Sequence, residues 1–280
     1  MVDRYRIFFL HCLNKMKKHF TCLRDNNCFP GGGEMEKDGS FLSRVGKAKK
    51  FESLDIAVVI PALNEEKSMG PFLRRLKDVF GDPFLLVVDG NSHDGTAEIA
   101  KELGAEIVFQ KGKGKGAALC EAFHCDCLNS DFVLIMDADE SMDPQEAPLL
   151  VKALMSGADV AKGSRFLLGG YSEDLTLVRR IGNKILVSLV NLVWSTNYTD
   201  LCYGFIGFKR EALRKISSRL RSKNFDIEAE ICIKAKKLGL KTVEVPSVEH
   251  PRRHGQSKLR TFRDGFDILK KILVESFRRY

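Results

Sequence analysis

The sequence predicts an α/β fold, with a mostly parallel, Rossmann-like central sheet flanked by helices and with a C-terminal amphipathic helix. From Asp55 onward, short apolar segments alternate with helical periodicities, which is typical of βαβ units with right-handed crossovers. Polar residues follow three of the first four apolar segments. In parallel sheets such strand ends meet at one edge, where ligands bind, so this edge is the predicted site.

The predicted strands are short and rich in β-branched or aromatic residues, and the predicted helices repeat apolar residues every three or four positions. Strands are expected at residues 56–60, 84–88, 107–109, 132–136 and 158–162, and helices at 66–80, 96–103, 115–128 and 144–155. The C-terminal helix has an apolar stripe of Leu259, Phe262, Phe266, Leu269, Leu273 and Phe277. We expect this stripe to pack on the domain; a position at a membrane interface is the alternative.

Length and composition indicate one large folded unit with an N-terminal appendage. The chain has 280 residues, of which 44% are hydrophobic and 29% charged, as in ordinary globular proteins. Residues 1–50 contain three consecutive glycines and little apolar periodicity, so we expect a basic, partly disordered appendage. Residues 51–280 would then form the functional domain.

The sequence also predicts a cytoplasmic location. No apolar stretch reaches the roughly 20 residues of a membrane-spanning helix, and no cleavage site of a signal peptide follows the apolar residues 7–13. The eight cysteines follow no disulfide-framework spacing, so free thiols are expected.

The formal charge of +8 is concentrated at the two ends of the chain. Residues 1–50 hold 11 basic and 5 acidic side chains, and residues 258–280 hold 7 and 3, which leaves a mildly acidic middle. This distribution argues against a general nucleic-acid-binding protein. The basic ends suit peripheral contact with an anionic membrane, and simple solvation of both ends is the alternative.

Three segments at the predicted strand ends carry the polar residues. They are Pro61-Ala62-Leu63-Asn64-Glu65-Glu66, the run from Asp89 to Thr96, and Asp137-Ala138-Asp139. Ser92 or Asp94 is expected to cap the helix near Thr96. Asp137 and Asp139 would point to one face and could share one Mg²⁺ or Mn²⁺ ion, with the phosphates of a nucleotide diphosphate as further ligands. An acidic loop before the helix at Pro144 is the alternative.

The run Lys111-Gly112-Lys113-Gly114-Lys115-Gly116 follows the third predicted strand. It matches neither the P-loop nor the dinucleotide-binding pattern. Its glycines would let the backbone approach a ligand closely, and its lysines would offset pyrophosphate charge. A plain flexible loop is the alternative.

Two arginines in the second half of the chain are candidates for binding a phosphate group. Arg165 follows the fifth predicted strand and Arg180 lies on a helical stretch, and arginine binds phosphate through two parallel hydrogen bonds. Ion pairs with Glu173 or Asp174 are the alternative.

Six motifs, in order along the chain, resemble those of the inverting family 2 glycosyltransferases with the GT-A fold. They are VVIPALNEE, VVDGNSHDGT, GKGKGAAL, LIMDADE, GSRF and DLCYGFIGFKR. The likeness runs from Asp55 to the C-terminus and is strongest to the dolichyl-phosphate mannose synthase-like and polyprenyl-phosphate sugar transferases. It implies transfer of a sugar from a donor of the GDP-mannose or UDP-glucose type to a polyprenyl or dolichyl phosphate, with Mg²⁺ or Mn²⁺ as cofactor.

The resemblance also implies roles for individual residues. Pro61, Ala62, Asn64 and Glu65 would line the nucleotide pocket, Asp89 would contact the base or ribose, and Lys115, Arg252 and Lys258 would lie near the pyrophosphate. Asp137 would lie near the ribose and donor sugar, and Asp139 would bind the metal ion. Arg165 and Arg180 would hold the phosphate of the acceptor, which is already an anion and needs orientation more than deprotonation. A hydroxyl acceptor would require a general base, for which Asp200 is the first candidate, followed by Glu228 and Glu230. His254 is expected to be a loop residue, and Glu228 to be either catalytic or part of a salt bridge.

One motif departs from the family pattern. Many enzymes of this branch continue the acidic motif as Asp-Ala-Asp-Leu-Gln, whereas this sequence has Glu140 and Ser141 at the positions of Leu and Gln. Glu140 is therefore expected either to face away from the metal ion or to add a carboxylate to it. Two further functions stay open: a soluble glycosyltransferase for a small phosphorylated or hydroxylated acceptor of the glycerate type, and a non-catalytic sugar-nucleotide-binding regulator.

Overall fold

A computed structural model of the chain describes residues 51, 53–255 and 259–278. The predicted appendage at residues 1–50 and Lys258 lie outside these described residues, so both expectations stay predictions. Among the described helices, none is long and apolar enough to cross a bilayer.

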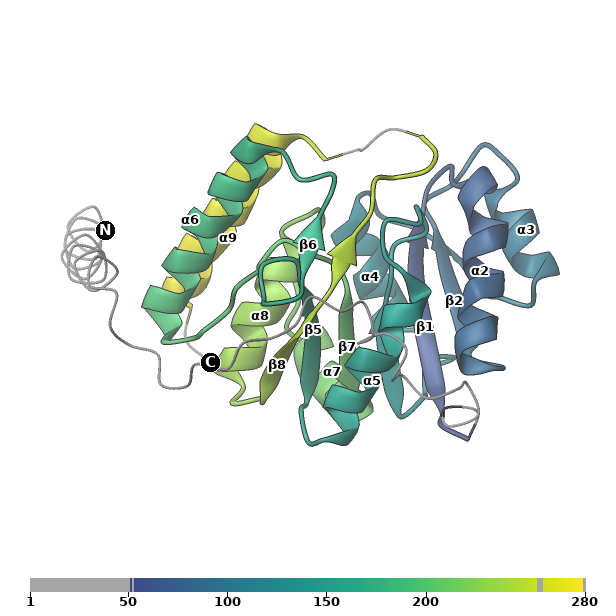
Figure 1. Cartoon of the computed structure of the whole chain (residues 1–280), viewed down its shortest axis with the longest axis horizontal. Coiled ribbons are helices and arrows are strands. Elements are labelled where there is room, and N and C mark those ends of the chain that lie inside the picture. Colours follow the sequence, from purple (N-terminus) through teal and green to yellow (C-terminus); the bar gives the residue numbers. More distant parts are fainter. Residues whose placement is uncertain (1–50, 52, 256–258, 279–280) are drawn as a thin grey trace, which may run out of the picture.

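A seven-stranded, mostly parallel sheet forms the centre of the domain (Figure 1). In spatial order its strands are β3 (Glu106–Phe109), β2 (Phe84–Asp89), β1 (Ile56–Ala62), β4 (Phe132–Ile135), β7 (Ile206–Lys209), β5 (Val160–Ser164) and β8 (Thr242–Pro246). Strand β7 runs antiparallel to both of its neighbours, β4 and β5, and the other pairings are parallel. A second, two-stranded sheet pairs β6 (Tyr171–Ser172) with β9 (Val248–Glu249).

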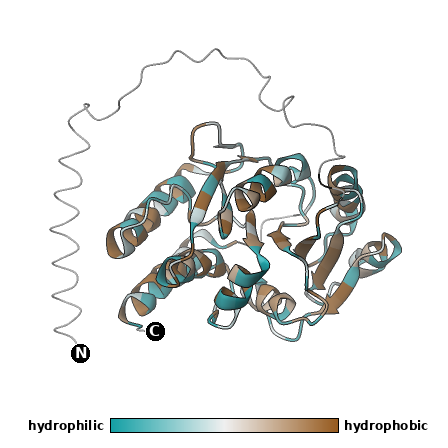
Figure 2. Ribbon diagram, turned by 90° about the horizontal axis from the view of Figure 1, so that it is seen from below, coloured by the Kyte–Doolittle hydropathy of each residue, from teal (hydrophilic) through white to brown (hydrophobic). Residues whose placement is uncertain are grey.

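Helices cover both faces of the large sheet, so its five inner strands are buried on two sides, whereas the edge strands β3 and β8 are partly exposed. In chain order they are α2 (Glu66–Phe80), α3 (Thr96–Glu102), α4 (Lys115–Phe123), the short η3 (Pro144–Glu146), α5 (Ala147–Met155), α6 (Leu177–Trp194), α7 (Arg210–Ser217), α8 (Ile227–Lys237) and α9 (Thr261–Phe277). Strand β1 alternates between two apolar cores: Val58 and Ile60 pack with α2 and α5, and Ala57 and Val59 pack with α4, α7 and α8. Figure 2 shows the apolar strands enclosed by helices with one apolar and one polar side.

A third core lies outside the sheet, between α6, α8 and α9. Helix α8 belongs to two cores, because Ile231 faces the sheet while Ile233 faces α6 and α9. Figure 1 accordingly shows α6 and α9 side by side, beyond α8.

The predicted fold class is confirmed, and the predicted elements match with small shifts at their ends. Helix α4 ends at Phe123 rather than near 128. The predicted helix 144–155 begins as the short η3, where Asp143 accepts a hydrogen bond from the backbone N–H of Gln145 at 2.9 Å.

The expectation that all cysteines are free thiols is wrong for two of them. Cys125 and Cys127 form a disulfide just after α4. Their Cα atoms lie 5.2 Å apart, which is within the usual range for a disulfide. Two cysteines separated by one residue can therefore pair although the cysteines of the chain follow no disulfide-framework spacing. Cys120, Cys202 and Cys232 are free thiols.

The expected packing of the C-terminal apolar stripe is wrong for its aromatic residues. The buried residues of α9 are the apolar Ile268 and Ile272 and the acidic Asp264 and Glu275. The side chains of Phe262 and Phe266 are 83% and 66% exposed. Ion pairs of Glu275 with Lys234 and Lys237 on α8 fix this rotation of the helix.

Candidate active site

The loops after β1 and β2 are joined by hydrogen bonds at the edge where both strands end. Ala62 and Asp89 are register partners in the parallel ladder. Beyond them, the backbone N–H of Asn64 donates to the Ser92 hydroxyl at 2.9 Å, and the Asn64 side-chain oxygen accepts from the backbone N–H of His93 at 2.9 Å. The predicted nucleotide-pocket residues Pro61, Ala62, Asn64 and Glu65 therefore adjoin Asp89.

Asp89 leaves one carboxylate oxygen unpaired inside the protein. Its side chain is almost fully buried, and Oδ1 accepts from the backbone N–H of Ser92 at 2.7 Å. Oδ2 is buried without a hydrogen-bond partner among the described residues. Since buried acceptors are normally satisfied, this oxygen is available for an N–H or O–H group of a ligand.

Asp94, rather than Ser92, holds the start of α3. Its Oδ1 accepts from the backbone N–H of Thr96 at 3.2 Å, and its Oδ2 from that of Glu66 at 3.3 Å. Asp94 thus has the structural role that a turn residue before a helix predicts.

The glycines of the lysine-glycine run let the backbone approach another part of the protein. Gly114 has a φ of 93°, and a Cβ atom there would lie 2.4 Å from the Lys223 carbonyl oxygen. A Cβ atom at Gly116 would lie 2.7 Å from the Ser222 carbonyl oxygen. This close contact fixes the position of Lys115, the first residue of α4.

Lys115 lies between two carboxylates. Its ammonium nitrogen is 2.7 Å from Asp137 and 2.9 Å from Glu228. Gly204 passes so close that a Cβ atom there would lie 2.5 Å from this nitrogen. Burial lowers the pKa of Lys115, but the charges of Asp137 and Glu228 outweigh burial and raise it above its ordinary value. Lys115 therefore stays charged, and Glu228 has the salt bridge that was one of its two predicted roles.

Asp137 and Asp139 have different partners. Burial raises the pKa of Asp137 by more than the charge of Lys115 lowers it. Asp139 is mostly buried, and its Oδ1 accepts from the backbone N–H and the hydroxyl of Ser141 at 3.0 and 2.7 Å. Its Oδ2 is paired with Arg252 at 2.7 Å.

Glu140 pairs with a different arginine from the one that binds Asp139. Its backbone is left-handed, with a φ of 59°, and its carboxylate pairs with Arg253 at 3.0 Å. Of the two residues that replace Leu-Gln in the family pattern, Ser141 therefore orients Asp139, and Glu140 binds an arginine instead.

The donor set fits a divalent ion that also binds a substrate. Among the described residues, no group of three or more His, Cys, Asp or Glu side chains could hold a metal ion. Asp137 and Asp139 offer hard carboxylate oxygens, and Mg²⁺ typically takes one or two carboxylates and completes its shell with water and substrate phosphates.

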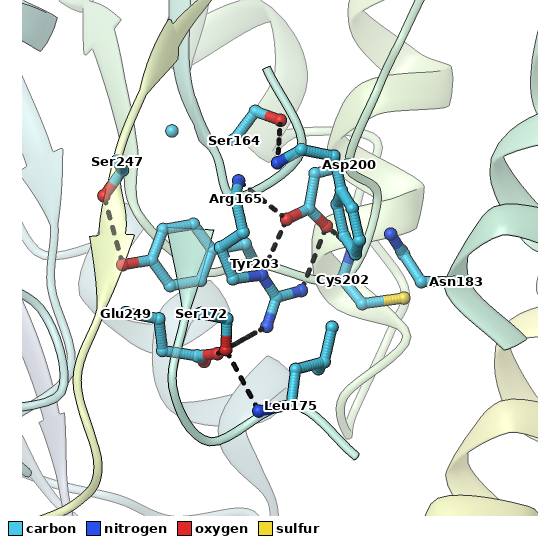
Figure 3. A network of polar contacts seen from close by, with 12 residues as sticks. Ser164, Arg165, Ser172, Leu175, Asn183, Asp200, Cys202, Tyr203, Ser247 and Glu249 are labelled. Carbon is cyan, nitrogen blue, oxygen red and sulfur yellow. Dashed lines mark hydrogen bonds and ion pairs between the residues drawn. The ribbon is translucent and has the colours of Figure 1, made fainter. Parts of the chain in front are cut away.

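Arg165 is buried in an ion-pair network (Figure 3). Its Nε and one terminal nitrogen donate to both oxygens of Asp200 at 2.7 and 3.0 Å, and its other terminal nitrogen donates to Glu249 at 3.1 Å. Its guanidinium carbon lies 4.8 Å from the centre of the Tyr203 ring. The alternative of ion pairs with Glu173 or Asp174 is wrong for Arg165, because its partners are Asp200 and Glu249.

Asp200 is fully buried and paired, which does not favour a role as general base. Burial raises the pKa of Asp200, but the charges of Arg165 and Lys162 outweigh it and hold the pKa below its ordinary value. A good base needs a pKa near the working pH and access to the proton it removes. Glu230 is also fully buried, and it accepts hydrogen bonds from the backbone N–H groups of Arg221 and Ser222.

Arg180, in contrast, is exposed near the start of α6. Its guanidinium carbon lies 6.0 Å from the centre of the Phe166 ring, and it has no ion pair with any residue that the structure describes. Arg179 beside it donates to the Thr261 hydroxyl at 3.0 Å and so ties the start of α6 to the start of α9. Of the two predicted acceptor arginines, only Arg180 offers its charge to a ligand.

The sequence analysis missed Glu249, which holds Arg165 from the other side. Glu249 lies in none of the six motifs, and it reaches Arg165 across 84 positions of the chain. A glutamate at the end of a two-residue strand carries no local signal that would have identified it.

Comparisons with known proteins place the sequence in a family. Residues 57–217 match the family model described as glycosyl transferase family 2. A polyprenol monophosphomannose synthase of Mycolicibacterium smegmatis is 31% identical over 211 residues, which are 72% of this chain and 80% of that protein. An uncharacterised protein of Methanocaldococcus jannaschii is 34% identical over 86% of this chain and 98% of its own length.

Solved structures share the fold. Glucosyl-3-phosphoglycerate synthase from Mycobacterium tuberculosis, in complex with Mn²⁺, UDP-glucose and phosphoglyceric acid, has a TM-score of 0.67 at 21% identity. The similarity covers 90% of each chain. With a mostly parallel sheet of the GT-A type, strand-end carboxylates and a matching family model over most of its length, this chain belongs to glycosyl transferase family 2.

Proposed function

We propose that the chain transfers a hexose from a nucleotide-diphospho sugar of the GDP-mannose or UDP-glucose type to a polyprenyl or dolichyl phosphate, and that it requires Mg²⁺ or Mn²⁺. Relatives named as polyprenyl-phosphate enzymes support the acceptor class, among them an undecaprenyl-phosphate mannosyltransferase of Micrococcus luteus that is 30% identical over 73% of this chain and 87% of that protein. The presence of both Asp137 and Asp139 argues against a non-catalytic regulator.

The donor would occupy the edge formed by the ends of β1, β2 and β4. Pro61, Ala62, Asn64 and Glu65 would line the nucleotide, and the unpaired oxygen of Asp89 would accept a hydrogen bond from the base or ribose. Lys115 would add positive charge near the diphosphate, and Arg252 would bind it.

The divalent ion, held by Asp139 with Asp137 beside it, would stabilise the charge that develops on the departing diphosphate. An oxygen of the acceptor phosphate attacks the anomeric carbon from the opposite side, and the bond from that carbon to the nucleoside diphosphate breaks. Arg180 would orient the acceptor phosphate. Because this oxygen is already negatively charged, no proton has to be removed, which agrees with the burial of Asp200.

One observation favours a lipid acceptor over a small soluble one: a large exposed apolar surface beside Arg180. We call it the α6/α9 surface; it consists of Leu177, Val178, Ile181 and Ile185 of α6 and Phe262 and Phe266 of α9, each 52–83% exposed. Exposed apolar side chains grouped on two adjacent helices commonly mark a site that binds a membrane or another protein.

The charge around the α6/α9 surface matches an anionic membrane. Residues 177–194 and 260–271 together hold seven basic and two acidic side chains, and α6 holds no acidic one. Basic residues around an apolar helix face are typical of interfacial helices, which lie in the headgroup layer. A polyprenyl phosphate in the bilayer would then present its phosphate next to Arg180.

A transfer screen tests the proposal. GDP-mannose and UDP-glucose are each supplied with Mn²⁺ or Mg²⁺ and either a short polyprenyl phosphate in detergent or 3-phosphoglycerate. We expect transfer to the polyprenyl phosphate, and we expect Asp139→Asn to abolish it without changing the circular dichroism spectrum. Transfer to 3-phosphoglycerate alone would contradict the lipid acceptor, and no transfer from any donor would contradict the activity.

A second experiment tests the membrane contact separately. The double variant Phe262→Ser/Phe266→Ser should reduce co-sedimentation with vesicles that contain an anionic lipid. Phe109→Ser is the matched control, because Phe109 is 60% exposed but lies on β3, at the edge of the sheet. Equal sedimentation of both variants would show that the α6/α9 surface is not the membrane contact.

A further inference from the structure

Arg252 joins two carboxylates that come from distant parts of the chain. One terminal nitrogen of its guanidinium lies 2.8 Å from Glu65, at the end of the loop after β1. The other lies 2.7 Å from Oδ2 of Asp139, after β4. Both carboxylates are at least nine-tenths buried as residues, so they need a nearby cation, and Arg252 supplies one.

Arg252 pairs with the carboxylate oxygen of Asp139 that Ser141 does not bind, and a metal ion would need this same oxygen. Oδ1 of Asp139 already accepts two hydrogen bonds from Ser141. Oδ2 is thus the oxygen best placed to bind another cation, and in the free protein it is paired with Arg252. A divalent ion and Arg252 would therefore compete for the same atom.

A diphosphate offers Arg252 another partner. The guanidinium group binds phosphate through two parallel hydrogen bonds, at least as well as it binds carboxylate. The side chain of Arg252 is 22% exposed, so its site is partly open to solvent and it can exchange one partner for another. When Arg252 binds the diphosphate, Oδ2 of Asp139 becomes free.

We infer that Arg252 makes the binding of the divalent ion depend on the binding of the nucleotide diphosphate. The inference rests on the proposed function, because it requires that the chain binds such a nucleotide. The ion alone must displace Arg252 from Asp139, whereas the nucleotide draws Arg252 away first. By thermodynamic reciprocity, the ion must increase the affinity for the nucleotide by the same factor.

The neighbouring arginine provides a matched control. Arg253 pairs with Glu140 rather than with Asp139, and its side chain is 67% exposed. Arg253→Gln removes one positive charge from the same loop, as Arg252→Gln does, but it leaves the pair between Arg252 and Asp139 intact.

Binding of Mn²⁺, measured by electron paramagnetic resonance with and without UDP or GDP, tests the inference. The Mn²⁺–nucleotide complex that forms without protein serves as the reference. UDP or GDP, whichever the protein binds, should tighten Mn²⁺ binding by about tenfold or more in the parent protein and in Arg253→Gln. This factor corresponds to one charged hydrogen bond. In Arg252→Gln, Mn²⁺ alone should bind about tenfold more tightly than in the parent protein, and the gain from nucleotide should be about tenfold smaller than the parent protein's gain, the remainder being direct binding of the ion by the diphosphate.

Arg252→Lys gives an independent measurement in case the glutamine variant does not fold. An ammonium group is a point charge and cannot bridge both carboxylates as the guanidinium does, so intermediate values are expected. If both variants bind Mn²⁺ as weakly as Arg253→Gln and keep the full gain from nucleotide, the inference is wrong while the proposed function stands. If the parent protein binds neither nucleotide in the presence of Mn²⁺, the proposed function fails, and this inference fails with it.

Discussion

Burial decides what each charged residue of the candidate site can do. Arg165 and Arg180 are the same residue type, lie 15 positions apart and have the same predicted role. Arg165 donates to Asp200 and Glu249 inside the protein, whereas Arg180 is exposed and unpaired within the described part of the chain. The first therefore positions the polypeptide, and the second is the candidate ligand of the acceptor phosphate.

Alanine variants should separate these two arginines. Arg180→Ala should lower kcat/KM for a phosphate acceptor about 10- to 100-fold, because a charged hydrogen bond contributes roughly 1.5 to 3 kcal/mol. Its donor affinity and Tm should not change, and Lys184→Ala on the same helix should leave all three quantities unchanged. Arg165→Ala should instead lower the free energy of unfolding by about 3 to 5 kcal/mol, because it leaves a buried carboxylate uncompensated. An Arg165→Ala protein of parental stability that fails to bind the acceptor would reverse the two roles.

Asp200→Asn should show a stability loss that depends on pH. The pKa of Asp200 in the folded protein is held below its ordinary value of 3.8, so its charge stabilises the fold fully above about that pH. We expect a loss of about 3 kcal/mol in the free energy of unfolding at pH 7. The difference in unfolding free energy between Asp200→Asn and the parent protein should shrink as the pH falls below 3.8 and through the lower pKa that Asp200 has in the folded protein. Urea unfolding from pH 7 to pH 3 measures it, with the exposed Asp174→Asn as control, and a difference that is constant over this range would contradict the assignment.

At the scale of elements, the C-terminal helix α9 is attached by buried charges as well as by apolar contacts. Glu275 of α9 and Lys234 of α8 are fully buried and lie 2.8 Å apart, and Lys237 lies 3.1 Å from the same carboxylate oxygen. Lys271 of α9 adds contacts to Asp226 at 3.3 Å and Glu230 at 3.5 Å. These pairs orient α9 so that Phe262 and Phe266 face outward, on the α6/α9 surface.

Removing the charge of Glu275 should loosen this attachment. We expect Glu275→Gln to lower the free energy of unfolding by about 3 kcal/mol, because Lys234 would lose the nearer of two counter-ions in a buried site and keep Glu230 at 3.7 Å. The double variant Lys234→Met/Glu275→Leu should recover much of the loss, since apolar side chains of similar size often replace a buried pair well. Asp267→Asn, on the same helix, is the control. Faster hydrogen exchange in α9 of Glu275→Gln would locate the effect, and parental exchange there would contradict it.

At the scale of the whole molecule, the first residue that the structure describes, Phe51, already belongs to the core. This ring is almost fully buried, and its centre lies 6.0 Å from that of Phe80 at the end of α2. Phe51 thus belongs to the core on the α2 side of the sheet. The sequence pattern begins only at Asp55, so it does not reveal this contact.

Two truncations test where the folded domain begins. Residues 51–280 should fold and bind nucleotide like the full chain, because the proposed domain starts there. Residues 55–280 should be less stable by about 3 to 5 kcal/mol, the usual loss when a buried phenylalanine is removed. Urea unfolding of both proteins measures this difference. An unfolded 51–280 protein would show that residues 1–50 contribute to the core.

The sequence by itself determined the first five strands of the large sheet, the helices between them, and the edge of the sheet at which the candidate site residues meet. All follow from local patterns: apolar periodicity distinguishes strand from helix, and polar residues directly after buried strands identify the end where ligands bind. For this reason β1, β2 and α2 appear almost where they were predicted, and Asp89 and Asp137 follow or end their strands.

Only the tertiary structure decided which charges are paired. Arg165 meets Asp200 across 35 positions and Glu249 across 84, and Arg252 meets Glu65 across 187. Such pairs depend on how separate elements pack, and a local window of sequence contains no information about that packing. The free energy of the charged form of a side chain depends on its burial and on the charges near it in space, and both are set only by the tertiary structure.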